Sequence, residues 1–237
     1  MKKQWTQEED RNLLALKKKG ATDHSISRIL GRGVRGVSTR LYHLHAAEKA
    51  LEPAPTERIG FLDIEASRLR STFGICLSYC IADENEKVVC ENVVSTSEMK
   101  RGTFDKRLMQ DCVRDLKKFD RLITWNGARF DIPFVRTRCM SHNIEFPGYR
   151  ELLHNDALLI ARIKMRTLHS KRLGAVCEFL EIPAKDHPLV PAIWLRALAG
   201  NVPALEFILQ HNREDVISLA KVWKRLRPHT RMPNTTI

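Results

Sequence analysis

Two carboxylates share one short apolar segment, Phe61-Leu62-Asp63-Ile64-Glu65. On a β-strand successive side chains alternate, so Asp63 and Glu65 point to one side while Leu62 and Ile64 point to the other. Neighbouring negative charges on a buried strand repel each other unless a cation neutralises them. Because the ligands offered are oxygens, Mg²⁺ or Mn²⁺ is the expected ion. An acidic pair at the solvated end of a strand is the simpler alternative.

A second motif, residues 123–133 (ITWNGARFDIP), joins an apolar strand to a helix that we expect to begin near Pro133. Asp131 lies within one position of the expected helix start. A metal ligand and a simple helix cap are both consistent with an aspartate at this place.

The third motif, residues 211–216 (HNREDV), lies within a long helix expected over 202–226. Asp215 falls on the stripe that otherwise faces the core, where an uncompensated carboxylate costs several kcal/mol. It therefore needs a partner or a metal. His211 lies one turn earlier on nearly the same face, where a hydrogen-bonded core histidine is the alternative to a catalytic one.

Alternating strand and helix patterns must position these motifs. We expect strands at 59–65, 73–82, 87–95 and 121–125 and further helices at 103–118, 132–141, 156–166, 172–181 and 191–199. The first three strands are close enough for antiparallel hairpins. The pattern predicts an α/β domain with a mixed sheet flanked by helices.

Taken in order, FLDIE, WNGARFD and HNREDV resemble the motifs of the DEDD exonucleases, and most closely the proofreading exonuclease of family-B DNA polymerases. Residues 173–186 (LGAVCEFLEIPAKD) add to this resemblance, which spans about 59–226. It implies a ribonuclease H-like fold and a 3′→5′ exonuclease.

The resemblance also implies the site. Asp63, Glu65, Asp131 and Asp215 would be the ligands of two divalent ions, Mg²⁺ or Mn²⁺, held about 3.5–4 Å apart, with Asp63 bridging both. The resemblance places two further residues at the 3′-end pocket, Asn126 and Phe130, with the Phe130 ring stacking on a base.

One departure concerns His211. In the resembled family a tyrosine has three residues between it and the last Asp, whereas a histidine usually has four; His211 has three. It could orient water, act as a general base or bond a metal ligand. Asp156, at a second strand–helix junction, is a candidate extra ligand, although helix capping is the simpler role.

Three short helical patterns precede residue 50. Thr6 and Glu9 form a capping box, Asp23 is a candidate cap for a second helix that ends at Gly31, and a third helix follows Gly33. This order predicts a small all-α helix-turn-helix domain whose last helix enters the major groove of DNA. The segments WTQEED, ILGR and VSTRLY resemble a Myb/SANT-like repeat, which implies nucleic-acid contacts from Arg32, Arg35, Ser38, Thr39, Arg40 and Tyr42. A protein-interaction module is the alternative.

The charge distribution agrees with a polyanionic partner. The chain of 237 residues has a net charge of +12, and residues 1–50 contain 11 basic and 5 acidic side chains. Such a field favours nucleic acid, although a basic surface without a partner is the alternative. We divide the chain into a helix-turn-helix domain (1–50), a linker with two prolines (51–58), an exonuclease domain (59–230) and a tail (231–237).

The six cysteines include no CxxC pair and lie in apolar runs, which predicts buried, reduced thiols in a cytoplasmic protein. No apolar run approaches the length of a membrane span. Together the sequence predicts a metal-dependent 3′→5′ exonuclease that acts on DNA single strands or 3′ ends and docks on duplex DNA through its first domain. The alternatives are an exonuclease on RNA or branched DNA, and a DNA-binding regulator or assembly factor with an inactive nuclease fold.

Overall fold

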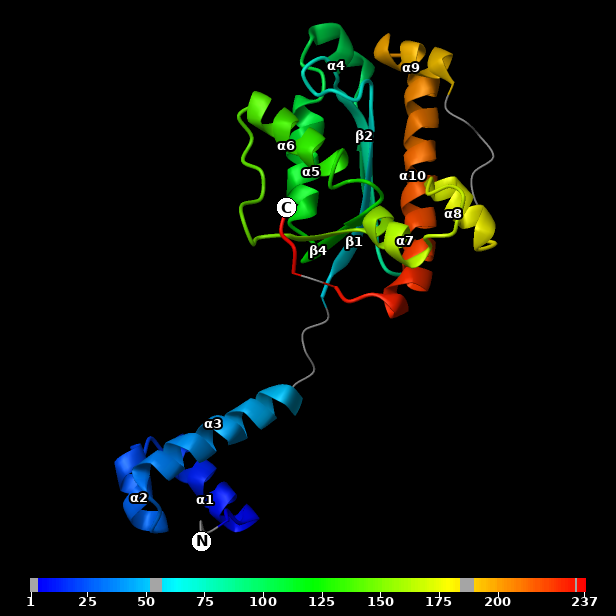
Figure 1. Ribbon diagram of the computed structural model, residues 1–237. Coiled ribbons are helices and arrows are strands. Elements are labelled where there is room, and N and C mark those ends of the chain that lie inside the picture. The colour runs from blue at the N-terminus through cyan, green and yellow to red at the C-terminus, as the bar shows by residue number, and fades with distance from the viewer. Residues whose placement is uncertain (1–3, 52–56, 184–189, 233) are drawn as a thin grey trace. The chain divides into compact units, whose positions relative to one another are not determined.

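The computed structural model describes residues 4–51, 57–183, 190–232 and 234–237. The chain divides into two compact units, Met1–Thr56 and Glu57–Ile237 (Figure 1). Most of the expected linker, residues 52–56, lies outside the described residues, and its first residue, Leu51, is the last residue of a helix.

The first unit is a three-helix domain formed by α1 (Gln7–Lys18), α2 (Asp23–Leu30) and α3 (Val34–Leu51). The expected capping box of Thr6 and Glu9 is confirmed, and Gly31 ends α2 in the left-handed conformation. The cap expected from Asp23 is wrong. Thr22 caps α2 instead, because Asp23 is already the first helical residue and its carboxylate pairs with Lys17 at 2.6 Å. The buried core of this unit contains one residue from α1, one from α2 and two from α3: Leu13, Ile26, Val37 and Leu41.

The second unit is built on a five-stranded mixed sheet. Its strands are β1 (Ile59–Ala66), β2 (Cys76–Ala82), β3 (Val88–Val93), β4 (Arg121–Thr124) and β5 (Leu153–Asp156), in the spatial order β3-β2-β1-β4-β5. The first three strands pair antiparallel, as expected, and β1, β4 and β5 pair parallel. This confirms an α/β domain with a mixed sheet and places β1 at its centre.

Helices cover both faces of the sheet (Figure 1). α5 (Lys106–Leu116) and α6 (Asp131–Ser141) pack on one face, and α7 (Ala157–Lys164), α8 (Leu173–Phe179) and α10 (Val202–Leu226) contribute to the core on the other. Three shorter elements complete the unit: α4 (Thr96–Arg101), α9 (Pro191–Leu198) and the single turn η1 (Arg227–His229). The side chains of β1 alternate between the two cores, with Leu62 in one and Phe61 in the other.

Several expected boundaries change. The strand expected over 73–82 begins only at Cys76, because residues 67–75 form a loop closed by two hydrogen bonds between Ser67 and Ile75. The helix expected over 103–118 is shorter, and the sequence reading missed α4, which starts with a capping box of Ser95 and Glu98. The long helix over 202–226 is confirmed. The last three residues of the 173–186 segment lie outside the described part of the chain.

Residues beyond η1 return to the sheet. The His154 amide donates to the Thr235 carbonyl at 2.7 Å, and the Ile237 amide donates to the Leu152 carbonyl at 3.3 Å. Thr236 forms an antiparallel bridge with Leu153. Part of the expected tail thus pairs with the outer edge of β5.

All six cysteines are buried, as the sequence predicted. Among the helices that the structure describes, none is both long enough and apolar enough to cross a membrane.

Candidate active site

The strand β1 presents Asp63 and Glu65 on the face that α10 covers. Both side chains are half-buried. They point to the same face of the strand as Phe61, whose ring lies in the core beneath α10. Glu65 pairs with Ser78 of β2, and the register shifts directly after it. The alternation expected from the sequence therefore places both carboxylates on one face at the carboxyl end of the central strand.

The helix α10 brings His211 and Asp215 to Glu65. His211 Nε2 lies 3.9 Å from Glu65 Oε1 and 3.9 Å from Asp215 Oδ2. One ligand atom from each of the three residues lies within 4.8 Å of the others. Asn212 fixes the helix below them, because its fully buried amide donates to Ser78 Oγ at 3.3 Å.

A tight turn between β4 and α6 delivers Asp131. Asn126 has a positive φ of 69°. Gly127 is required because a Cβ there would lie 2.3 Å from Thr124 Oγ1. Asp156 holds this turn by accepting hydrogen bonds from the amides of Asn126 and Ala128, at 3.0 and 3.1 Å, and it also caps α7 through the Leu158 amide. The capping role expected for Asp156 is confirmed, and the turn adds two further donors.

Asp131 is the first residue of α6 and does not serve as its N-cap. Its Oδ1 accepts a hydrogen bond from the Ile64 amide at 3.1 Å, so the carboxylate lies against β1 between the positions of Asp63 and Glu65. Burial raises the pKa of Asp131 to about 7, and the charges of Asp156 and Asp215 add to the rise. Hydrogen bonds from the backbone amides of Ile64 and of Asp131 itself act in the opposite direction and lower the pKa. A cation beside Asp131 would favour the ionised carboxylate.

The support beneath the turn is also buried. Thr124 Oγ1 and His154 Nε2 lie 2.8 Å apart. Burial lowers the pKa of His154 to about 4, so the imidazole is neutral at neutral pH. The turn thus rests on polar side chains that are paired within the protein.

The donor set suits a hard divalent cation. Glu65 and Asp215 offer carboxylate oxygens, the ligand type that Mg²⁺ and Mn²⁺ sites use, and His211 adds a ring nitrogen beside them. Asp131 reaches the same strand through the Ile64 amide, and Asp63 lies two residues from Glu65 on the same face. The group within 4.8 Å consists of Glu65, His211 and Asp215, and it contains neither Asp63 nor Asp131.

The two residues expected at the 3′-end pocket have different surroundings. Asn126 lines a cleft of about 490 Å³ beside the turn. Phe130 packs against the hydrophobic core, with its ring centroid 5.5 Å from that of Phe134. The aromatic ring in the cleft is instead that of Trp125, whose indole N–H donates to the Lys171 carbonyl at 3.2 Å.

This cleft combines one aromatic ring, apolar side chains and three cations, and its lining residues are Trp125, Asn126, Leu158, Arg162, Lys171, Arg172 and Leu173. The sequence reading missed the cations, although the basic run over 162–172 between two helices was a usable signal.

In the first unit, two of the expected nucleic-acid contacts are engaged internally. Arg32 pairs with Glu9 at 2.8 Å and lies 4.7 Å above the Trp5 ring. Arg40 pairs with Asp10 at 2.6 Å. The hydrogen bond from Arg32, with that from the Thr6 amide, lowers the pKa of Glu9 to about 2.

The remaining candidates of the first unit lie on the exposed side of α3. Arg35, Ser38, Thr39 and Tyr42 are all exposed, and Ser38 also donates a hydrogen bond to Asp23 Oδ2 at 2.6 Å. A cleft of about 600 Å³ opens beside Arg35 and Thr39. These four side chains are the part of the expected set that faces solvent.

Comparisons with known proteins bear on the second unit. Residues 60–227 match the family model described as the RNase H superfamily. Among solved structures, the chain is similar to the family B DNA polymerase from the hyperthermophilic archaeon Pyrobaculum calidifontis, with a TM-score of 0.58 and 18% identity over 73% of this chain. The chain spans only 25% of that polymerase, so the likeness supports the fold. No curated protein matches the sequence.

Proposed function

Because the chain belongs to the RNase H superfamily, we propose that it is a metal-dependent 3′→5′ exonuclease acting on DNA. The observation that supports the proposal best is the convergence of Glu65, His211 and Asp215, from a strand and a helix, within 4.8 Å. Asp131 lies against the same strand through the Ile64 amide. Acidic groups that converge at the carboxyl end of the central strand suit hydrolysis of a phosphodiester.

Four carboxylates would hold the metal: Asp63, Glu65, Asp131 and Asp215. Two bound Mg²⁺ or Mn²⁺ ions would lower the pKa of the attacking water and stabilise the leaving oxygen. The protein itself fixes where these carboxylates lie. The buried Asn212–Ser78 hydrogen bond fixes α10, and the Ile64 amide orients Asp131.

His211 would orient the attacking water through Nε2. This nitrogen faces both Glu65 and Asp215 at 3.9 Å, so a water or a scissile phosphate near these carboxylates would be within its reach. We favour water orientation over a full general base, because the metal ions alone would lower the pKa of the water.

We call the cleft lined by Trp125 and Asn126 the substrate cleft, and it would hold the 3′-terminal nucleotides. Arg162, Lys171 and Arg172 supply positive charge for phosphates, and Trp125 supplies an aromatic surface. Asn126 belongs both to this cleft and to the turn that ends at Asp131. A strand bound there would therefore lie beside the carboxylates.

A direct assay tests the activity. We expect 5′-labelled single-stranded DNA to shorten one nucleotide at a time in Mg²⁺ or Mn²⁺ and to stay intact in EDTA. Products that appear first as internal fragments would contradict exonuclease action. Cleavage of RNA with no cleavage of DNA would make RNA the substrate instead of DNA. Cleavage of neither would favour a DNA-binding regulator or assembly factor.

The first unit would dock the enzyme on duplex nucleic acid through the exposed side of α3. Arg35 is exposed there, beside Thr39. Replacement of Arg35 by alanine should weaken binding of duplex DNA and lower the slope of log K against log salt by about 0.9, the value for one phosphate contact. Arg28→Ala, an exposed arginine on α2, is the matched control. An unchanged slope in Arg35→Ala would favour a protein-interaction module.

A further inference from the structure

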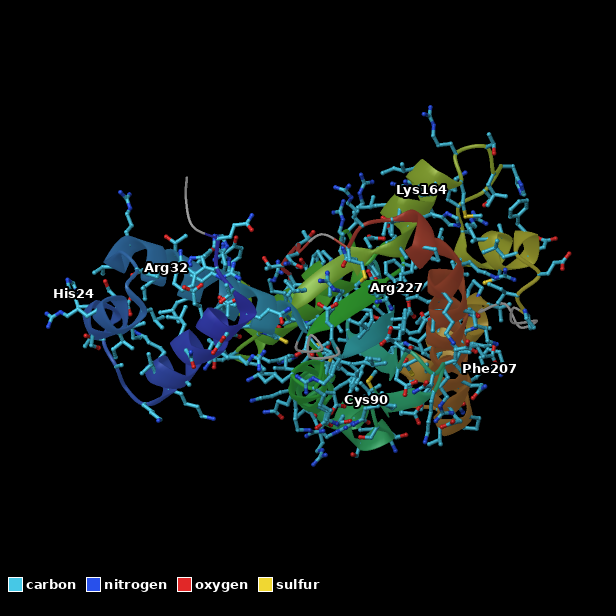
Figure 2. All side chains as sticks on the ribbon, turned by 90° about the horizontal axis from the view of Figure 1, so that it is seen from below. His24, Arg32, Cys90, Lys164, Phe207 and Arg227 are labelled. Atoms are coloured by element: carbon cyan, nitrogen blue, oxygen red, sulfur yellow. The ribbon has the colours of Figure 1, made fainter. Side chains whose placement is uncertain are left out.

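A second pocket lies where three helices of the second unit end. Its volume is about 540 Å³. It is lined by two residues at each helix end and one of η1: Lys164 and Met165 at the end of α7, Phe179 and Leu180 at the end of α8, Arg225 and Leu226 at the end of α10, and His229. We call it the distal pocket. Figure 2 labels Lys164 at the end of α7, and Arg227 at the end of α10 on the same side of the unit.

The chemistry of the distal pocket combines an exposed ring with cations. Phe179 is 64% exposed, although burial of a phenylalanine ring would stabilise the folded protein. Lys164, Arg225 and His229 line the same pocket, and none of the described residues that line it is acidic. Glu178 lies next to Phe179 in sequence and is not part of the lining.

Helix dipoles alone do not account for this arrangement. Cations near helix C-termini are favourable in any protein, so Lys164 and Arg225 have a structural explanation. The exposed ring of Phe179 gains nothing from a dipole. A surface on which an aromatic ring lies among cations suits a nucleic-acid strand, whose bases stack while its phosphates are neutralised.

The helix α7 connects the distal pocket to the substrate cleft. Leu158 and Arg162 line the cleft, and Lys164 at the end of the same helix lines the pocket. The segment 161–172 contains five basic residues and no acidic one. A strand that leaves the cleft would therefore meet positive charge as far as the distal pocket.

We propose that the distal pocket binds a second portion of the same single strand, 5′ to the portion in the substrate cleft. Phe179 stacks on a base there, and Lys164 and Arg225 contact the flanking phosphates. This inference rests on the proposed nuclease function, because it needs a strand whose 3′ end is in the cleft. Its consequence is that affinity depends on strand length.

Binding of strands of two lengths tests the proposal. We would measure fluorescence anisotropy of labelled single strands of about 4 and about 16 nucleotides, the range of such sites, with the full chain in EDTA so that no cleavage occurs. Phe179→Ala should weaken binding of the long strand about 5–150-fold, the range for loss of one stacked base. Phe179→Tyr should retain binding, and binding of the short strand should not change.

Charge variants complete the test. Arg225→Ala should weaken binding of the long strand and lower the slope of log K against log salt by about 0.7. Lys117→Ala, at the end of α5 on the opposite face of the sheet, is the matched control. Unchanged affinity of both Phe179→Ala and Arg225→Ala for the long strand would overturn the proposal. The proposal would also be overturned if binding of an Asp-rich peptide that ends in phenylalanine required Phe179 and Arg225 while binding of the single strand did not.

The two proposals fail in different ways. If the wild-type chain cleaves short strands in Mg²⁺ but its affinity does not depend on Phe179, only the distal pocket is wrong. If long strands bind through Phe179 and no strand is cleaved in any metal, the nuclease function is wrong and the pocket remains a nucleic-acid site.

Discussion

The two halves of the candidate active site are prepared in different ways. The turn that leads to Asp131 is fixed by buried hydrogen bonds, chiefly those from the Asn126 and Ala128 amides to Asp156. The other half joins Glu65 of β1 to His211 and Asp215 of α10. The Nε2 atom of His211 lies 3.9 Å from a carboxylate oxygen of Glu65 and 3.9 Å from one of Asp215.

This difference separates stability from activity. The turn satisfies its own polar groups, so the protein gains stability from it before any ligand binds. The half formed by β1 and α10 brings two carboxylates together, and like charges at short range oppose folding unless a cation is present. Substitutions in the first half should therefore cost stability, and those in the second should cost activity.

The largest expected effect is in the half formed by β1 and α10. Asp215→Ala should reduce cleavage more than about 10³-fold, above the loss of a single electrostatic contact. In EDTA its melting temperature should be equal to or above that of the wild type, because repulsion with Glu65 is removed. Glu214→Ala, the adjacent residue, is the control for activity. Full activity of Asp215→Ala, or a lower melting temperature in EDTA, would contradict this assignment.

His211 should give the next largest effect. His211→Ala should lose about 10²–10⁴-fold in rate if Nε2 takes a proton. If His211 only braces a ligand, metal affinity should fall about 10–100-fold and excess Mn²⁺ should restore the rate. His211→Tyr should recover much of the loss if water orientation is the role. A tyrosine variant as slow as the alanine variant at saturating metal would count against it.

In the turn, Asp156→Ala should lower the free energy of unfolding by about 2–4 kcal/mol, since three backbone amides lose a buried acceptor. Urea unfolding measures this loss. Asp156→Asn should lose less, because an amide oxygen still accepts. A loss of activity in Asp156→Ala with no loss of stability would make Asp156 a ligand and remove the contrast between the halves.

The last effect depends on pH and is absent at neutral pH. The pKa of His154 is about 4 in the folded protein and about 6.5 when unfolded. The unfolded chain therefore binds more protons between these values, so the His154 contribution to stability is complete above about pH 6.5 and is lost as pH falls toward 4. The expected loss is about 3 kcal/mol.

The difference in unfolding free energy between wild type and His154→Gln isolates this contribution. Asp131 acts in the opposite direction over part of the range, because burial raises its pKa to about 7, and the subtraction removes it. A difference that stays flat from pH 7 to pH 4 would show that His154 is not buried as a neutral group.

Local periodicity explains what the sequence could predict. Alternation along a strand placed Asp63 and Glu65 on one face, and a spacing of four on a helix placed His211 beside Asp215. The mixed sheet followed from the order of strand and helix patterns. These features depend on neighbours in sequence, which is why they were accessible.

Long-range pairs explain what the sequence reading missed. Arg40 pairs with Asp10 from 30 residues away, so its guanidinium is engaged within the first unit. Phe130 lies against Phe134 and the core rather than in the cleft. Asp156 reaches back 30 residues to the Asn126 amide. The contacts of Arg40 and Asp156 each span 30 residues and leave no local pattern, so only the folded chain reveals them.

The pairing of residues 235–237 with β5 has a consequence for self-association. An open strand edge offers unpaired N–H and C=O groups that can recruit a strand from another molecule. Here the His154 amide and the Leu152 carbonyl are already occupied by Thr235 and Ile237. Residues 235–237 thus cover the β5 edge of the sheet, and a substitution that releases them would expose a template for edge-to-edge pairing.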